Sequence, residues 1–299
     1  HTQMVCYTTE GTGSSLRWAV SVGNVPGPVF FGGSSSYAPP SVISYSGPGS
    51  RLANTSGNQA VVVFGMNFGP IGSPLDSISY GVDGNDFRAA NCVTSVAHYE
   101  LTCLTVVGAG AQLKWLVQID GQLNTDPSTD YSPPLITGIS GPGAFNAHTD
   151  GGDNVIITGT NFATNEWLTS VTYGQSGTEN KAIDCQVTVN HTEITCKTSS
   201  GTGRKLKWIV TVRGQSSPTS CCDAQGNGFY TSYAYPELTS VSPRNGPAAG
   251  GKVITLYGNN LGFLSESDIQ VKIDSRASDS NPRPSSSLVD LYWENAYKS

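Results

Sequence analysis

The chain has 299 residues, enough for two or three ordinary domains, and only 13% of them are charged, while 35 are Gly and 17 are Pro. This composition favours short strands joined by many turns over long helices or coiled coils. The net charge of −6, without a run of Lys and Arg, argues against a nucleic-acid partner, and no stretch approaches the roughly 18 apolar residues of a membrane span.

The first element follows the turn Gly11-Thr12-Gly13, where Leu16, Trp18, Val20 and Val22 occupy alternate positions. The same arrangement returns at residues 108–119 and 201–212. A period of two predicts a strand with one buried face, so we expect Trp18, Trp115 and Trp208 to pack in cores and not to stack on sugars. The Gly-rich turn ahead of each strand predicts a hairpin.

The second element is a turn, then a β-branched run, then a Gly-x-Asn turn that ends in Phe or Leu. It occurs three times, with β-branched runs that begin at Val61, Val155 and Val253. A Tyr followed by Pro closes each unit, and Pro ends strand pairing.

Three ordered copies of this opening turn, Gly-x-Asn turn and closing strand resemble the IPT/TIG family, which has an immunoglobulin-like fold. The resemblance covers essentially the whole chain and implies an all-β protein of tandem β-sandwiches. It does not imply one function, since that fold serves adhesion, signalling and DNA binding alike.

Aligning the copies predicts two complete domains, at residues 39–132 and 133–236. Residues 1–38 are then the C-terminal half of a domain, which would donate strands, and residues 237–299 are the N-terminal half, which would accept them. The second half stops near the position where the first half starts.

A half sandwich leaves core residues and strand edges facing water. One interpretation is a fragment of a longer polyprotein. The other, which we favour, is a head-to-tail homopolymer in which the N-terminal strands of one copy complete the C-terminal half of the next. We expect its interface to contain Leu16, Trp18, Val20, Val22, Val253, Leu256, Ile273 and Trp293.

Seven cysteines are present. Cys92 and Cys103 have the same spacing as Cys185 and Cys196, at equivalent places in the two complete domains, which predicts two intradomain disulfides and an oxidising, extracellular compartment. The spacing does not suit zinc. Cys6, Cys221 and Cys222 are left over, and two alternatives stay open: an intersubunit bond between Cys6 and Cys221 or Cys222, or a vicinal Cys221–Cys222 bond.

Two sequons, at Asn54 and Asn190, predict N-linked glycans, although two are no more than chance in a chain so rich in Ser and Thr. Their weight comes from the extracellular assignment.

No catalytic or metal-binding grouping stands out, and we expect neither enzyme activity nor a cofactor. Residues 246–252 have phosphate-loop spacing but lead into a strand without the hydroxyl that would hold magnesium, so they are the opening turn. Residues 83–86 are expected to be a turn and not a calcium loop. His98 and His191 are expected at exposed turns.

The predicted function is an extracellular structural protein at the cell surface, with itself and covalent glycans as partners. The alternative is a receptor or adhesion ectodomain that binds a protein or a carbohydrate. The acidity and the disulfide pattern disfavour a DNA-binding protein.

Overall fold

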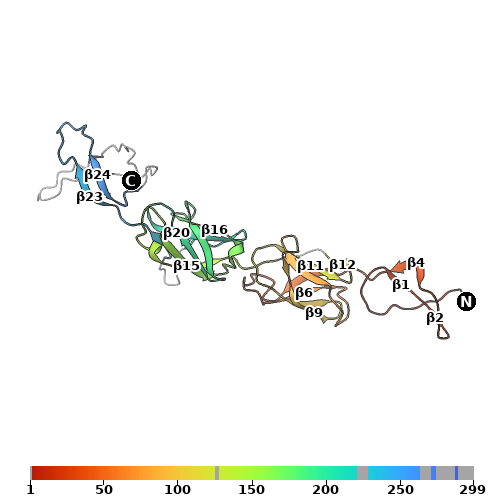
Figure 1. Cartoon of the computed structure of the whole chain (residues 1–299). Helices are drawn as coiled ribbons and strands as arrows, with labels where there is room; N and C mark the ends of the chain where they lie inside the picture. The colour runs from red at the N-terminus through yellow and green to blue at the C-terminus, as the bar shows by residue number, and fades with distance from the viewer. Residues whose placement is uncertain (1, 125–127, 221–227, 263–270, 274–286, 289–299) are drawn as a thin grey trace.

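A computed structural model describes residues 2–124, 128–220, 228–262, 271–273 and 287–288. Over these residues the chain is built of antiparallel β-sheets with two short 3₁₀ helices. Two sandwiches occupy the middle of the chain, and smaller two-stranded sheets lie at the two opposite ends (Figure 1).

The first sandwich packs two sheets against each other. One sheet has the order β5-β6-β10-β9 (Ser41–Ser46, Ala60–Met66, Glu100–Leu104, Ala90–Val96). The other has the order β12-β11-β7-β8, with β13 also on β11 (Gln122–Leu123, Leu113–Ile119, Ser77–Gly81, Phe87–Arg88, Ser128–Thr129).

The second sandwich repeats this topology. Its first sheet has the order β14-β15-β19-β18 (Leu135–Ser140, Asn154–Thr160, Glu193–Lys197, Ile183–Val189). Its second sheet has the order β17-β16-β20-β21, with β22 also on β20 (Asn180–Lys181, Leu168–Gly174, Arg204–Val212, Gln215–Ser216, Thr231–Ser232). The 3₁₀ helices η1 (Pro142–Ala144) and η2 (Asn165–Trp167) lie in its connections.

Each sandwich has its own apolar core, to which the alternating motif contributes directly. Along β11 and β20 every second side chain is buried, and Trp115 and Trp208 are fully inaccessible. Each indole stacks on a tyrosine of the neighbouring strand, Tyr80 or Tyr173, and donates from Nε1 to the hydroxyl of Thr129 or Thr231. The prediction of a buried Trp is therefore confirmed in both sandwiches.

The end segments contain the remaining strands. At the N-terminal end β1 (Leu16–Trp18) pairs with β4 (Phe30–Ser35), and β2 (Ser21–Val22) pairs with β3 (Val25–Pro26). At the C-terminal end β23 (Glu237–Ser242) pairs with β24 (Thr255–Asn259), and β25 (Lys272–Ile273) pairs with β26 (Ser287–Leu288).

Two predictions about the strands are wrong. The Gly-rich turn at 108–110 joins β10 of one sheet to β11 of the other, so it crosses between the layers and does not close a hairpin. The core register in β24 is also shifted by one residue: Ser242 pairs with Thr255, as Ser140 pairs with Ile156. Ile254, and not Val253, therefore occupies the position of the buried Val155, and Val253 is 81% exposed.

Candidate assembly site

The N-terminal segment carries the core motif with its apolar face open to solvent. Leu16, Trp18, Val20 and Val22 are all exposed, and Trp18 is 43% accessible where Trp115 and Trp208 are 0%. Among the described residues, β1 to β4 pair only with one another, and none of these four side chains belongs to the apolar core of either sandwich.

The local geometry of the segment is nevertheless that of the complete sandwiches. The Trp18 indole donates to Ser35 Oγ at 3.0 Å, just as Trp115 and Trp208 donate to a threonine hydroxyl. The Tyr37 hydroxyl donates to the Thr9 carbonyl at 2.6 Å, matching the bonds from Tyr131 to Val106 and from Tyr233 to Ser199. The segment thus repeats hydrogen bonds that both complete sandwiches form.

The C-terminal segment repeats the first strand pair of the second sandwich. Its β23–β24 pair repeats the register of β14–β15, including a shift at the same place. Leu238 and Ile254 are exposed, whereas Ile136 and Val155 at the equivalent positions of the second sandwich are buried. The predicted interface residue Leu256 is half-buried; the side chain of Ile273 and all of Trp293 lie outside the described residues.

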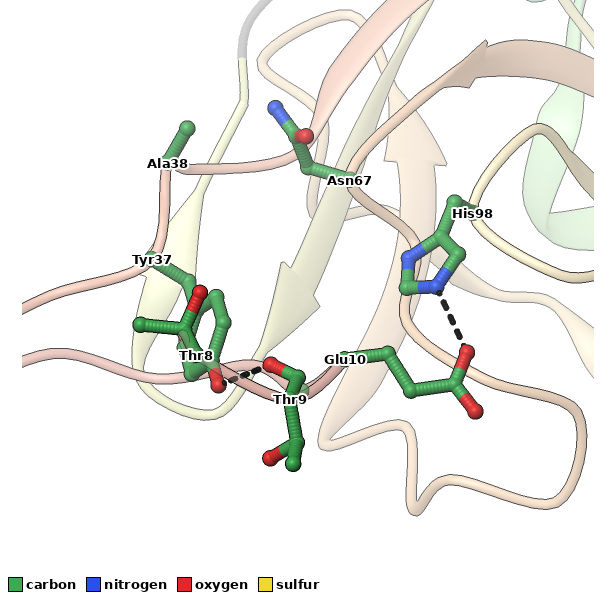
Figure 2. A pocket seen from close by; sticks show the side chains of 8 residues that line it. Thr8, Thr9, Glu10, Tyr37, Ala38, Asn67 and His98 are labelled. Atoms are coloured by element: carbon green, nitrogen blue, oxygen red, sulfur yellow. Dashed lines mark hydrogen bonds and ion pairs between the residues drawn. The ribbon is translucent and has the colours of Figure 1, made fainter. Parts of the chain in front are cut away.

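A pocket of about 330 Å³ lies where the N-terminal segment meets the first sandwich (Figure 2). Polar groups dominate its wall, which is made by Thr8, Thr9, Glu10, Gly11, Tyr37, Ala38, Asn67 and His98. Across it, His98 Nε2 lies 3.3 Å from Glu10 Oε2, which ties the segment to the sandwich.

The junction between the two sandwiches is closely packed. Arg213 Nη2 donates to Asp86 Oδ2 at 2.6 Å, and the guanidinium lies over the ring of Phe87, which also meets Trp167 edge-on. Ala109 of the first sandwich is buried in the core cluster of the second. These contacts hold the two sandwiches in series, as Figure 1 shows.

Both turn histidines lie at junctions and are half-buried, so the prediction of exposed histidines is wrong. Thr55 Oγ1 lies 2.8 Å from His191 Nδ1, and the Thr55 amide donates to Asn161 Oδ1 at 3.4 Å. Burial lowers the pKa of His191, because the imidazolium loses hydration there. Asn67, Asn161 and Asn260 were not predicted as junction residues, although an Asn recurs at this place in every Gly-x-Asn turn.

A tyrosine pair closes the same edge of each sandwich. The hydroxyls of Tyr80 and Tyr131 are 2.6 Å apart, as are those of Tyr173 and Tyr233. Burial is the main cause that raises the pKa of Tyr80, Tyr131 and Tyr233 above the usual value.

The disulfides Cys92–Cys103 and Cys185–Cys196 are present, and each links two neighbouring strands of one sheet. They are consistent with an extracellular protein. Cys6 is an exposed free thiol, and Cys221 and Cys222 lie outside the described residues.

The two sequons meet at the junction of the sandwiches. Asn54 and Asn190 are exposed, while their neighbours Thr55 and His191 are in contact. Glycans on both asparagines remain a prediction.

The acidic turn 83–86 serves the junction. Asp86 accepts from the Val82 amide and from Arg213. Within the described ranges no group of three His, Cys, Asp or Glu side chains is placed to hold a metal ion. No helix in that part of the chain is long and apolar enough to cross a membrane.

Comparison with known families finds the IPT/TIG domain at residues 134–225 and again at 236–291. The second match begins with β23 and β24. No curated protein matches the chain.

Solved structures match only distantly. A protein solved with a xylogluco-oligosaccharide is 16% identical with a TM-score of 0.35, and the match covers 75% of this chain and 48% of that one. SGBP-B from a xyloglucan utilization locus of Bacteroides uniformis is 13% identical with a TM-score of 0.26, over 68% of this chain and 54% of that one. The Escherichia coli adhesin FdeC is 12% identical with a TM-score of 0.27, over 76% of this chain and 88% of that one. The chain thus spans about half the length of the first two proteins.

Proposed function

Because this chain contains tandem IPT/TIG domains, we propose that it is a non-enzymatic, extracellular structural protein whose copies join head to tail into a filament. The N-terminal segment of one copy completes the C-terminal segment of the next, and together they make one further sandwich. The observation that carries this proposal is the contrast in burial of one motif, which is inaccessible in β11 and β20 and exposed around β1.

The cost of leaving these faces in water supports an intermolecular contact. Fully burying a Val or Leu side chain contributes about 1.5–3 kcal/mol, and Trp18, Val20, Val22, Leu238 and Ile254 are all exposed in the single chain. A contact that restores the core of a sandwich would resemble an obligate interface, on the order of 2,000 Å² or more.

The two segments lie at opposite ends of the row of domains (Figure 1), so they do not complete each other within one copy. The contact joins different surfaces of two copies and does not close on itself, and such a heterologous contact generates an open filament.

Electron microscopy and light scattering of the purified 299-residue chain test the proposal. The wild type is expected to form fibres above a critical concentration. Trp18→Asp on the donor face and Ile254→Asp on the acceptor face are each expected to abolish them. An equimolar mixture of the two variants retains one intact donor and one intact acceptor, so it is expected to give dimers and no fibres.

A wild type that stays monomeric at all concentrations would refute the filament. It would favour the alternative in which the segments belong to neighbouring repeats of a longer receptor or adhesion ectodomain. Fibres from either single variant would also contradict the proposed contact.

A further inference from the structure

The pocket at the N-terminal junction is lined by residues whose counterparts in both sandwiches hold the opening turn. Thr8, Thr9, Gly11, Tyr37 and Ala38 line it. The Gly-x-Gly turns and the Tyr that follows each motif align Thr8 with Thr105 and Thr198, and Tyr37 with Tyr131 and Tyr233. What these counterparts bind therefore indicates what the pocket would accept.

In the first sandwich they bind the loop between β5 and β6. The Thr105 hydroxyl accepts from the Gln59 amide at 3.1 Å, the Gly108 amide donates to the Thr55 carbonyl at 2.9 Å, and Ala53 forms a parallel bridge with Tyr131.

The second sandwich has the same set of bonds. The Thr198 hydroxyl accepts from the Asp153 amide at 3.2 Å, the Gly201 amide donates to the Thr149 carbonyl at 2.9 Å, and Ala147 bridges to Tyr233. In the N-terminal segment the corresponding threonine, Thr8, is exposed, and the segment itself contains no such loop.

The C-terminal segment carries the matching loop, at residues 246–252, and this loop is exposed. Its turn is closed by a bond from the Gly250 amide to the Pro247 carbonyl, 3.1 Å, as the other loops are closed by Gly57 to Asn54 and Gly151 to His148. All three glycines have a positive φ, between 72° and 79°. This match aligns Ala248 with Thr55 and Thr149, and Lys252 with Gln59 and Asp153.

We propose that this pocket is the socket for the turn at residues 246–252 of a second copy of the chain, an inference that rests on the proposed head-to-tail assembly. The Thr8 hydroxyl accepts from the Lys252 amide, the Gly11 amide donates to the Ala248 carbonyl, and Gly246 lies against Tyr37.

The socket also joins the first sandwich to the sandwich that the two segments form together. The Thr55 amide donates to Asn161 Oδ1 in the junction of the two sandwiches, and Asn67 stands at the position of Asn161, its Nδ2 similarly bonded to a proline carbonyl. Asn67 Oδ1 is therefore the acceptor for the Ala248 amide. Ala248 offers no hydroxyl to His98, which agrees with the pairing of His98 with Glu10 where His191 contacts Thr55.

The first test uses two neighbouring glycines of the turn as variant and control. A Cβ at Gly57 or Gly151 would lie 2.4 or 2.5 Å from the backbone of Val106 or Ser199, whereas a Cβ at Gly250 or Gly251 of the free chain meets nothing within 4 Å. Asn tolerates positive φ. Gly250→Asn is thus expected to clash with Thr9 only on seating, and to raise the critical concentration for fibres at least tenfold. Gly251→Asn is the matched control, since the first sandwich already has Asn58 at that position with φ 58°.

The second test changes the socket. Thr8→Val leaves the Lys252 amide without a hydrogen-bond acceptor in the assembled state. The cost of that unsatisfied amide weakens assembly and is expected to raise the critical concentration about tenfold. Thr9→Val is its control, because the first sandwich has Val106 there, and it is expected to assemble like the wild type.

The outcomes separate the socket from the assembly itself. Wild-type fibres that are weakened by Gly250→Asn and Thr8→Val, and unaffected by both controls, support the socket. Fibres from all four variants at the wild-type concentration, or equal loss in variants and controls, overturn the socket and leave strand complementation standing. A wild type that forms no fibres overturns both.

Discussion

Strand β20 of the second sandwich and strand β1 of the N-terminal segment carry the same motif in different surroundings. Both pair with a following strand, and both hold the Trp indole on a hydroxyl of that strand. Yet Trp208 is inaccessible and stacks on Tyr173, while Trp18 is 43% exposed. Strand pairing therefore follows from the motif and the residues close to it in the chain. Burial of the Trp depends on a second sheet, which the motif does not specify.

Replacing each Trp by Ala is expected to give the largest difference in stability between the two regions. Trp208→Ala removes a fully buried indole, so we expect the free energy of unfolding of the second sandwich to fall by about 3–5 kcal/mol. Trp18→Ala is expected to change the stability of the unassembled chain by less than about 0.5 kcal/mol. Urea denaturation followed by circular dichroism, at a concentration below assembly, measures both, and an equal loss in the two variants would contradict the difference in burial.

Removing a disulfide from a sandwich is expected to lower stability, whereas removing the free thiol of the N-terminal segment is not. The double change Cys185→Ala with Cys196→Ala releases a closed loop of about 11 residues, and chain entropy predicts a loss of about 3 kcal/mol. Cys6→Ala is the control and is expected to leave thermal unfolding unchanged, because Cys6 is exposed and unpaired. Full stability of the double variant would show that Cys185–Cys196 contributes nothing to the fold.

Removing one hydroxyl of the buried tyrosine pair is expected to lower the free energy of unfolding by less than removing the disulfide. Tyr233→Phe removes the hydrogen bonds to the Tyr173 hydroxyl and to the Ser199 carbonyl and is expected to cost about 1–2 kcal/mol. Because burial raises the pKa of Tyr131 and Tyr233, the unfolded chain ionises first, near pH 10, and the stability they contribute is present below that pH and lost above it. Alkaline titration of tyrosine absorbance should show groups that ionise only on unfolding, and fewer of them in the variant.

The smallest effect concerns the junction of the sandwiches. Burial lowers the pKa of His191, so the unfolded chain takes up a proton near pH 6.5 before the folded chain does. Stability is therefore fully present above that pH and declines as the pH falls below it. Melting temperatures at pH 7.5 and pH 5 should differ more for the wild type than for His191→Gln; an equal difference would show that this histidine does not contribute.

Much of the fold could be predicted because it depends on short-range patterns. Alternation at Leu113, Trp115 and Val117 specifies a strand with one apolar face, and a repeated cysteine spacing across adjacent strands specifies Cys92–Cys103. Repetition of the whole pattern indicated a tandem IPT/TIG protein, and the structure and the family match both show one.

The candidate site was predicted less completely, because it depends on which segments meet. The sequence alone predicted apolar faces at Trp18 and Leu256, of which the structure leaves Trp18 exposed and Leu256 half-buried. Pairing register was needed to replace Val253 by Ile254. Which sheet a strand joins after a Gly-rich turn, as at 108–110, is a matter of long-range pairing that a local period does not contain.

The sequence by itself therefore determined the apolar alternation of the motif strands and the disulfide partners, since each follows from alternation or from a repeated spacing. Only the tertiary structure decided that His98, Asn67 and Tyr37 surround one pocket and that Asp86 meets Arg213, because those contacts join residues that lie far apart in the chain. Their physical basis is the stacking of one sandwich on the next, which brings the turns at facing ends together.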